Sequence, residues 1–272
     1  MEQCIPIYLR KFKMKLALTL LFCAASTALL ANGDSNFPFR VGEKLTYQIL
    51  WGPFVAGHAT LEVTGIEKID DKDCYHLVGQ AHTSGLVDML YPVKSQVDSW
   101  LDTNELFTRR FQQNRLEGKR RTTTDSHYDY ISNQLVTTNL VSGKSKTTPL
   151  TNAVQDVLSA FFYVRTKDLQ INVDQGFPIN LAGDYRDVQV RPDERKKLYF
   201  RPTGEIPALH IEPKPTFSMV AAHGGRMWFW VSDDNRKLPL LLVSEIKLGS
   251  LKLVLTGVQS TPILGKQTLA NH

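Results

Sequence analysis

The sequence predicts a mainly β fold, an antiparallel curved sheet or half-open barrel with one embedded amphipathic helix. Three observations predict it. Segments in which apolar and polar residues alternate recur along most of the chain, as they do in strands with one buried face. Roughly a dozen such segments follow one another at short spacing, which is typical of antiparallel sheets and barrels. One segment instead repeats its apolar residues at the period of a helix.

The chain begins with a predicted secretory signal peptide over residues 1–31. Basic residues precede an apolar run from Leu16 to Ala31, and small residues from Ala24 to Ala28 close the core of that run. This order is typical of a cleaved export signal. The apolar core is about fifteen residues long, shorter than the roughly 20 that a membrane-spanning helix needs. An uncleaved N-terminal anchor is the alternative. Met14 offers a second start, which would shorten the basic region to Met14 and Lys15.

Small residues place the cleavage site at Ala28, Ala31 or Gly33, and the sequence leaves these three open. A lipid anchor on Cys23 is not expected, because the bulky Phe22 directly precedes that cysteine. The mature protein is therefore expected to be periplasmic or secreted. Residues 32–260 are predicted to form a single β-rich domain and residues 261–272 a loose C-terminal tail.

The charge balance changes once the leader is removed. Four of the 32 basic and one of the 27 acidic residues lie in residues 1–31, which leaves 28 and 26 in the mature chain. This near-neutral balance argues against a nucleic-acid partner, which requires a concentrated basic face. No second apolar segment is long enough to span a membrane, so no stable membrane span is expected after cleavage. Only Cys74 of the three cysteines remains, so no internal disulfide is expected.

The first elements are strands. Residues 45–50 alternate, and two longer alternating segments, 57–64 and 75–82, flank a polar turn at 70–73. We expect these two segments to pair as a hairpin. Further strands are predicted at 93–101, 106–116, 122–131 and 134–141.

An amphipathic helix is predicted next. Its apolar face follows a period of 3.6 residues and consists of Val154, Val157, Leu158, Phe161 and Phe162. Asn152 is expected to cap its N-terminus, with Gln155 as the capping-box partner. Arg165 ends the helix, where a cation complements the helix dipole. Because one face is apolar, the helix is expected to dock against the sheet.

Strands return after the helix. They are predicted at 177–181, 187–191, 197–201, 208–212 and 227–231. A last hairpin is predicted in the tail, where residues 245–248 and 251–256 alternate around Gly249 and Ser250. A glycine at the first turn position suits a two-residue type II′ turn.

Three motifs in a fixed order extend over nearly all of the mature chain, from Phe37 to about Leu255. They are Gly42–Tyr47 with Trp51 and Ala56–Ala59, then Asp156–Arg165, then Trp230–Asp234 with Pro239 and the tail hairpin. In their order and spacing they resemble an uncharacterised family of exported bacterial β-rich proteins, a domain of unknown function. The resemblance implies a curved sheet or half-open barrel in the periplasm. It implies no activity, because the family has no established catalytic residues.

No catalytic residue, metal ligand or cofactor is predicted. His58, His76 and His82 share the solvent face of the first hairpin without the close spacing of a metal site. The acidic turn at 70–73 lacks the glycine and glutamate of an EF-hand loop. Ser159 is interpreted as a small residue where the helix meets the sheet. Basic clusters at 109–110, 119–121 and 195–197 are interpreted as solvated strand edges, with contact to a membrane surface as the alternative.

Small residues on the inward face of the first hairpin are the main indication of function. Such residues either admit a helix closely or leave a cavity. One interpretation is that Phe161 and Phe162 fill this space, and the other is an apolar pocket. The predicted pocket lining is Trp51, Gly57, Ala59, Gly79, Ala81, Phe161, Phe162, Trp228 and Trp230.

The predicted function is non-catalytic binding or carriage of an apolar ligand of the cell envelope. One alternative is a structural or accessory protein that binds another envelope protein. A hydrolase that uses His and Asp side chains is the second alternative. The expected partner is accordingly an apolar ligand or an envelope protein.

Overall fold

The computed structural model describes residues 37–260 except 182, 201–203, 215–225 and 247–248. By its internal contacts the chain divides into two units, residues 1–36 and residues 37–272, and only the second contains described residues. This unit is mainly β, and its large antiparallel sheet does not close into a barrel. The predicted fold class is confirmed. Within the described ranges, no helix is long and apolar enough to cross a bilayer.

Among the described residues, thirteen strands make up the large sheet, two more form a separate pair, and two short helices interrupt them. In chain order the elements are β1 (Lys44–Trp51), β2 (Phe54–Ile69), β3 (Lys72–Thr83), α1 (Gly85–Leu90), β4 (Val93–Asp102), β5 (Thr108–Glu117), β6 (Arg120–Asp129), β7 (Gln134–Asn139), β8 (Ser145–Pro149), α2 (Ser159–Arg165), β9 (Gln175–Leu181), β10 (Asp184–Val190), β11 (Pro192–Phe200), β12 (Gly204–Ile211), β13 (Met227–Ser232), β14 (Pro239–Ile246) and β15 (Gly249–Gln259).

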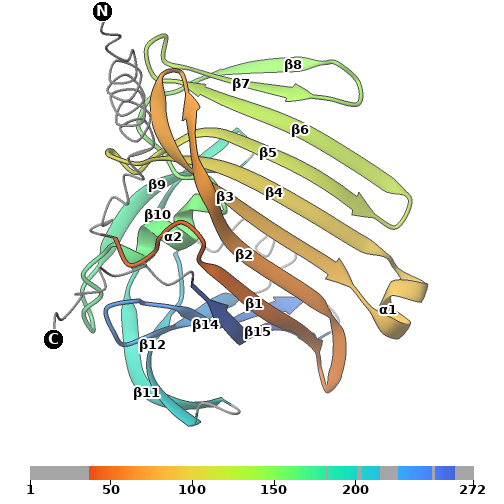
Figure 1. Cartoon of the computed structure of the whole chain (residues 1–272), viewed down its shortest axis with the longest axis vertical. Coiled ribbons are helices and arrows are strands. Elements are labelled where there is room, and N and C mark those ends of the chain that lie inside the picture. Colours follow the sequence, from red (N-terminus) through yellow and green to blue (C-terminus); the bar gives the residue numbers. More distant parts are fainter. Residues whose placement is uncertain (1–36, 182, 201–203, 215–225, 247–248, 261–272) are drawn as a thin grey trace, which may run out of the picture. The chain divides into compact units, whose positions relative to one another are not determined.

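The strand order of the large sheet is β11-β12-β13-β14-β15-β1-β2-β3-β4-β5-β6-β7-β8. Sequence neighbours therefore pair almost throughout, and β15 closes the order by pairing antiparallel with β1. β11 and β8 remain as the two edges. Figure 1 shows the sheet bending strongly, with α2 and the β9–β10 pair on its concave side.

The first hairpin forms as predicted. β2 pairs with β3, and Ala59 lies opposite Ala81. Asp70 and Asp71 form the turn with positive φ angles of 49° and 60°, a conformation that aspartate tolerates better than most residues. The hairpin buries Ala59 and Leu77 on one face. We call this the inner face of the sheet, and the opposite one, which carries His58 and His82, the outer face.

The predicted helix exists, but it is much shorter than expected. It begins at Ser159, so Val154 and Gln155 are not helical, and Asn152 is not its cap. Gln155 instead forms a parallel bridge with Ile179 of β9, and its backbone amide donates to Pro178 O at 3.0 Å. That backbone pairing holds the segment extended and outweighs the helical pattern of its side chains.

Two other expectations were wrong. α1 was not predicted, because its six residues are too few to show a helical period. In the tail hairpin, Gly249 pairs with Ile246 and Ser250 with Glu245, so Gly249 and Ser250 belong to strand β15. The predicted turn at Gly249 and Ser250 is therefore wrong, and residues 247–248 lie outside the described residues.

Candidate functional site

A small apolar cavity lies between α2, the β9–β10 pair and the large sheet. The space open to the centre of a water molecule is about 20 Å³, and its exposed lining is wholly apolar. This is room for about one water molecule. The lining residues are Ala160, Phe161, Val164, Arg165, Phe177, Val190, Pro213, Phe229, Val231 and Pro239.

The cavity borders the largest group of buried apolar side chains. Ala160 and Val164 of α2 pack with Phe177 of β9 and with Phe229 of β13 in one cluster. The rings of Phe161 and Phe229 meet at 6.2 Å between centroids in an edge-to-face arrangement. Phe161 is only half-buried, whereas Ala160 and Val164 are buried.

Arg165 is one of the lining residues of the cavity and is only 2% exposed. Its Nη1 donates to Glu43 Oε1 at 2.6 Å and its Nη2 to Glu43 Oε2 at 3.1 Å. Nη2 also donates to Pro38 O at 2.8 Å, and Nε donates to Arg236 O at 3.1 Å. All three guanidinium nitrogens are thus engaged, so the charge is neutralised inside the protein. Sequence analysis assigned Arg165 to the helix dipole and missed this pair, because the residues lie 122 positions apart.

Asp156 is fully buried and joins α2 to strands β4 and β5. Its Oδ1 accepts from the amides of Leu158 and Ser159 at 2.7 and 2.9 Å. Its Oδ2 accepts from Ser99 Oγ at 2.5 Å and Thr108 Oγ1 at 2.8 Å. Burial raises the pKa of the Asp156 carboxyl, while these four hydrogen bonds act in the opposite direction. The buried carboxylate therefore holds the start of α2 against β4 and β5, and it is not accessible to a substrate.

Ser159 belongs to the same network. Its Oγ lies 2.9 Å from Thr108 Oγ1 and accepts from the amide of Asp156 at 2.8 Å. The network consists of hydroxyls, backbone amides and one carboxylate, and these groups are buried. A serine nucleophile requires an adjacent base and access to substrate, and this arrangement offers Ser159 neither.

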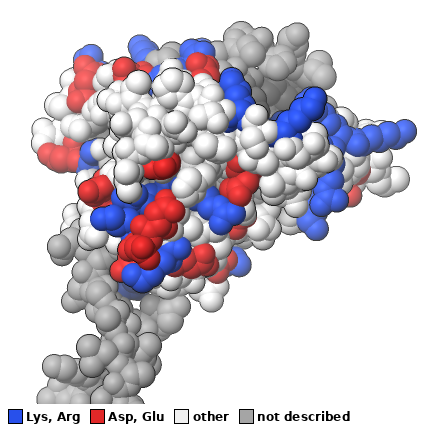
Figure 2. All heavy atoms as spheres, turned by 90° about the horizontal axis from the view of Figure 1, so that it is seen from above, with Lys and Arg blue, Asp and Glu red and all other residues white. Residues whose placement is uncertain are grey.

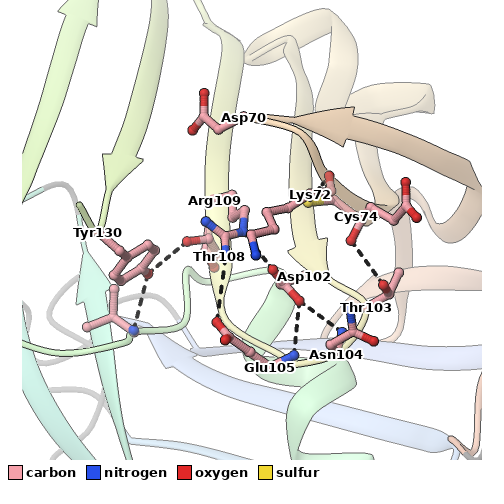
Figure 3. Close-up of polar contacts among 12 residues, drawn as sticks. Asp70, Lys72, Cys74, Asp102, Thr103, Asn104, Glu105, Thr108, Arg109 and Tyr130 are labelled. Carbon is pink, nitrogen blue, oxygen red and sulfur yellow. Dashed lines mark hydrogen bonds and ion pairs between the residues drawn. The ribbon is translucent and has the colours of Figure 1, made fainter.

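A second buried pair lies at the turn between β4 and β5 (Figure 3). Arg109 Nε donates to Asp102 Oδ2 at 2.6 Å, and the amides of Asn104 and Glu105 donate to Asp102 Oδ1 at 2.9 and 3.0 Å. Burial works against ionisation of Asp102, but the hydrogen bonds from Glu105, Arg109 and Asn104 outweigh it. The pKa of Asp102 is therefore below its ordinary value.

Cys74 lies near this pair on β3 and is fully buried. Its Sγ is 3.5 Å from Lys72 O, to which it donates. Burial raises the pKa of this thiol to about 11. Because the thiolate is the reactive form, Cys74 is a packed thiol with no access to substrate.

The three histidines of the first hairpin lie on the outer face, as predicted. His58 and His82 are cross-strand neighbours with ring centroids 5.8 Å apart. His76 stacks on Trp100, and its two ring nitrogens lie 3.0 Å from carboxylate oxygens of Glu67 and Asp98. In the part of the chain that the structure describes, no three His, Cys, Asp or Glu side chains are arranged to hold a metal ion.

The predicted pocket residues are divided among several places. Only Phe161 lines the cavity. Phe162 packs on Phe39, at 5.2 Å between ring centroids. Trp51 is 38% exposed at the end of β1. The small residues Ala59 and Ala81 share a third cluster with the two tryptophans of β13, Trp228 and Trp230.

The two glycines of the inner face have specific neighbours. A Cβ at Gly79 would lie 2.9 Å from Val97 and 3.5 Å from Leu158. A Cβ at Gly57 would lie 2.1 Å from the backbone oxygen of His82. The space above Gly79 is thus occupied by Leu158, from the segment that leads into α2. Gly57 is required by a close backbone approach.

Together these features define a class of protein: an open, strongly curved antiparallel sheet around a short buried helix, with an apolar interior and internally neutralised charges. The chain belongs to the family described as "Protein of unknown function (DUF3108)", whose profile matches residues 46–256. The predicted resemblance is confirmed.

A solved structure with a similar fold is among those that match. It is a β-barrel-like protein of the domain of unknown function DUF1849 from Brucella abortus. The TM-score is 0.51 at 9% sequence identity, over 80% of this chain and 97% of that chain. At this identity the likeness concerns the fold alone. No curated protein matches the sequence.

Proposed function

We propose that this protein works outside the cytoplasm as a non-catalytic binding protein for an apolar ligand of the cell envelope, such as an acyl chain. The observation that carries the proposal is the cavity between α2 and the sheet, because its exposed lining is wholly apolar. An apolar lining discriminates against polar molecules and favours hydrocarbon. The buried charge beside it, Arg165, is already neutralised by Glu43, so no anionic head group is required within the cavity.

Ligand entry requires the cavity to expand. Its present volume of about 20 Å³ is too small for an acyl chain. Phe161 is the side chain best placed to move, since it lies on the lining and is only half-buried. Rotation of Phe161 away from Phe229 would enlarge the cavity.

The first experiment measures what the protein carries. Protein isolated from its native envelope fraction is analysed by native mass spectrometry and by solvent extraction. We expect a bound apolar molecule in roughly stoichiometric amount. After delipidation, a fluorescent fatty acid should bind again. Absence of a co-purifying apolar molecule together with absence of rebinding would refute the proposal.

The second experiment locates the ligand with matched variants. Ala160→Leu fills the cavity from α2, whereas Ala81→Leu adds the same atoms on the inner face of β3, outside the cavity lining. We expect Ala160→Leu to weaken fatty-acid binding at least about tenfold, since it removes the space by overpacking, and Ala81→Leu to bind normally. The reverse result would place the ligand along the small-residue face instead. Circular dichroism controls for folding of both variants.

The alternative of an accessory protein that binds another envelope protein has weaker support. Both sheet edges are open, and strand addition at an edge is a common mode of recognition. The edge strand β11, however, exposes Glu194, Arg195, Lys196 and Lys197 in succession. Charged residues of this kind deter edge pairing, so we favour ligand binding.

A further inference from the structure

One end of the sheet carries the turns between β1 and β2, β3 and β4, β5 and β6, and β7 and β8. The strand registers place them together: Gly57 lies opposite Thr83, Val93 opposite Glu117, and Thr124 opposite Asn139. The turn between β3 and β4 contains α1. We call this end, consisting of residues 51–55, 84–94, 117–121 and 139–146, the α1 rim.

The α1 rim exposes large apolar side chains. Leu86, Met89 and Leu90 of α1 are 76%, 82% and 85% exposed, and no residue of α1 is buried. Phe54 in the neighbouring turn is 66% exposed and Tyr91 is 55% exposed. Single exposed apolar residues are ordinary, but a contiguous group marks an interaction surface.

Hydrogen bonds hold α1 in place, so its apolar side chains are presented on a fixed platform. Thr83 Oγ1 donates to Asp88 Oδ1 at 2.6 Å and accepts from the amide of Val93 at 2.8 Å. The amide of Ser84 donates to Ala56 O at 2.9 Å. Across the rim, the Gly118 amide donates to Pro92 O at 2.8 Å, which ties the turn between β5 and β6 to α1.

Basic residues flank these apolar side chains. Lys94, Lys119, Arg120, Arg121, Lys144 and Lys146 are all exposed on the rim. Two acids accompany them: Asp88, which is bonded to Thr83, and Glu117, which lies 3.1 Å from the Arg115 guanidinium. Figure 2 shows Lys and Arg predominating at its right-hand end, toward which α1 and the turn between β5 and β6 extend in Figure 1.

The opposite end of the same strands has the reverse character. Its turns carry the acids Asp70, Asp71, Asp73, Asp102, Glu105 and Asp129. They also carry the bases Lys68, Lys72 and Arg109; Arg109 and Asp102 neutralise each other as a buried pair, which leaves five acids against two bases. The sheet is therefore polarised along its strands, and the apolar group of α1 lies at the positive end.

We propose that the α1 rim docks on the surface of a bilayer that contains anionic phospholipid. Leu86, Met89, Leu90 and Phe54 enter the interface between head groups and acyl chains. The lysines and arginines beside them contact the phosphates. Protruding apolar side chains ringed by cations fit this surface, because interfacial binding combines buried apolar area with attraction to anionic lipid. A protein partner would need an acidic concave surface that matches the α1 rim, and no other feature of the rim calls for a protein partner.

The test is flotation of the protein with vesicles. Vesicles of phosphatidylcholine alone are compared with vesicles that also contain phosphatidylglycerol. We expect binding to the anionic vesicles that falls as salt is raised. The triple variant Lys119→Gln, Arg120→Gln, Arg121→Gln should bind at least about tenfold more weakly. The triple variant Leu86→Ser, Met89→Ser, Leu90→Ser should lose most binding at any salt concentration.

Two controls match these variants. Arg195→Gln, Lys196→Gln, Lys197→Gln removes the same charge from the edge strand β11. Ile131→Ser removes the most exposed apolar side chain of the opposite end, which is 95% exposed. Both controls should bind like the parent protein. Equal losses in the two charge variants would show attraction by net charge alone and overturn the proposal. So would absence of binding to anionic vesicles, or binding only to an envelope protein in lipid-free extract.

The outcome is separable from that of ligand carriage. Vesicle binding depends on residues of the α1 rim, none of which lines the cavity, and fatty-acid binding depends on Ala160. A protein that floats with vesicles but binds no fatty acid would retain the docking surface and lose the carrier role. A protein that binds fatty acid but does not float with vesicles would retain the carrier role and lose the docking surface.

Discussion

At the scale of single residues, buried charges are neutralised in pairs, one of them across 122 positions and the other across seven. Arg165 and Glu43 are 2% and 7% exposed, and Arg109 and Asp102 are 8% and 2% exposed. Each arginine also lies over two aromatic rings. The partner of Arg165 could not be predicted from the sequence, because pairing across more than a hundred residues has no local signal. These pairs fix the position of α2 and of the turn between β4 and β5.

Breaking one buried pair should be more harmful than replacing both partners. Glu43→Gln leaves the Arg165 charge buried without a counter-ion, so we expect a loss of about 3–5 kcal/mol in the free energy of unfolding. The double variant Glu43→Leu, Arg165→Met removes both charges and should recover a substantial part of that loss. Urea denaturation measures both. A double variant less stable than Glu43→Gln would show that the pair stabilises the fold beyond its charge balance.

Asp102 should give the protein a characteristic response to acid. Its folded pKa is below the ordinary 3.8, so the folded state binds the proton less readily than the unfolded chain. The stabilising effect is complete above the unfolded pKa and is lost as the pH falls through the folded pKa. We expect Asp102→Asn to reduce stability at pH 7 and to flatten the fall in stability below about pH 4. Unfolding curves between pH 7 and pH 3 measure the slope; identical slopes in both proteins would contradict this assignment.

At the scale of elements, the alternation of apolar and polar residues predicted the strands well, whereas the helical period predicted the helix only in part. The position of the β2–β3 hairpin was predicted, and so was which of its two faces is buried. The helix was predicted from five apolar residues, yet Val154 and Gln155 are not part of it. Side-chain period does not reveal that Gln155 bonds to β9 through its backbone. The cavity depends on this detail, since it sets which residues of α2 face the β9–β10 pair.

The true start of α2 can be tested by comparing two caps. Asp156 accepts the amides of Leu158 and Ser159, whereas Asn152 is exposed and outside the helix. Asp156→Ala should cost about 2–4 kcal/mol, because it removes a cap and leaves buried Ser99 and Thr108 hydroxyls without their acceptor. Asn152→Ala should change stability by less than about 0.5 kcal/mol. Equal effects in thermal unfolding would indicate that the helix extends to the position that the sequence pattern predicted.

At the scale of the whole molecule, the strand order distinguishes pairings between neighbouring strands in the sequence from pairings between distant ones. Neighbours along the chain pair almost everywhere, so a long antiparallel meander follows from short turns alone. The exception is β15, which pairs with β1 across some two hundred residues. No alternation pattern encodes that contact, and it decides which inner faces lie together. The cluster of Ala59 with Trp230 exists only because β15 joins the two halves of the sheet.

The predicted export signal is a property of the whole chain that experiment can settle directly. When the full chain is expressed in a bacterium, the protein should appear in the periplasmic extract with 28, 31 or 33 residues removed, since small residues at these positions suit signal cleavage. Intact mass spectrometry of that extract distinguishes the three. Leu20→Arg, which interrupts the apolar core, should hold the protein inside the cell at full length. A full-length product in the membrane pellet of the parent would favour an uncleaved anchor.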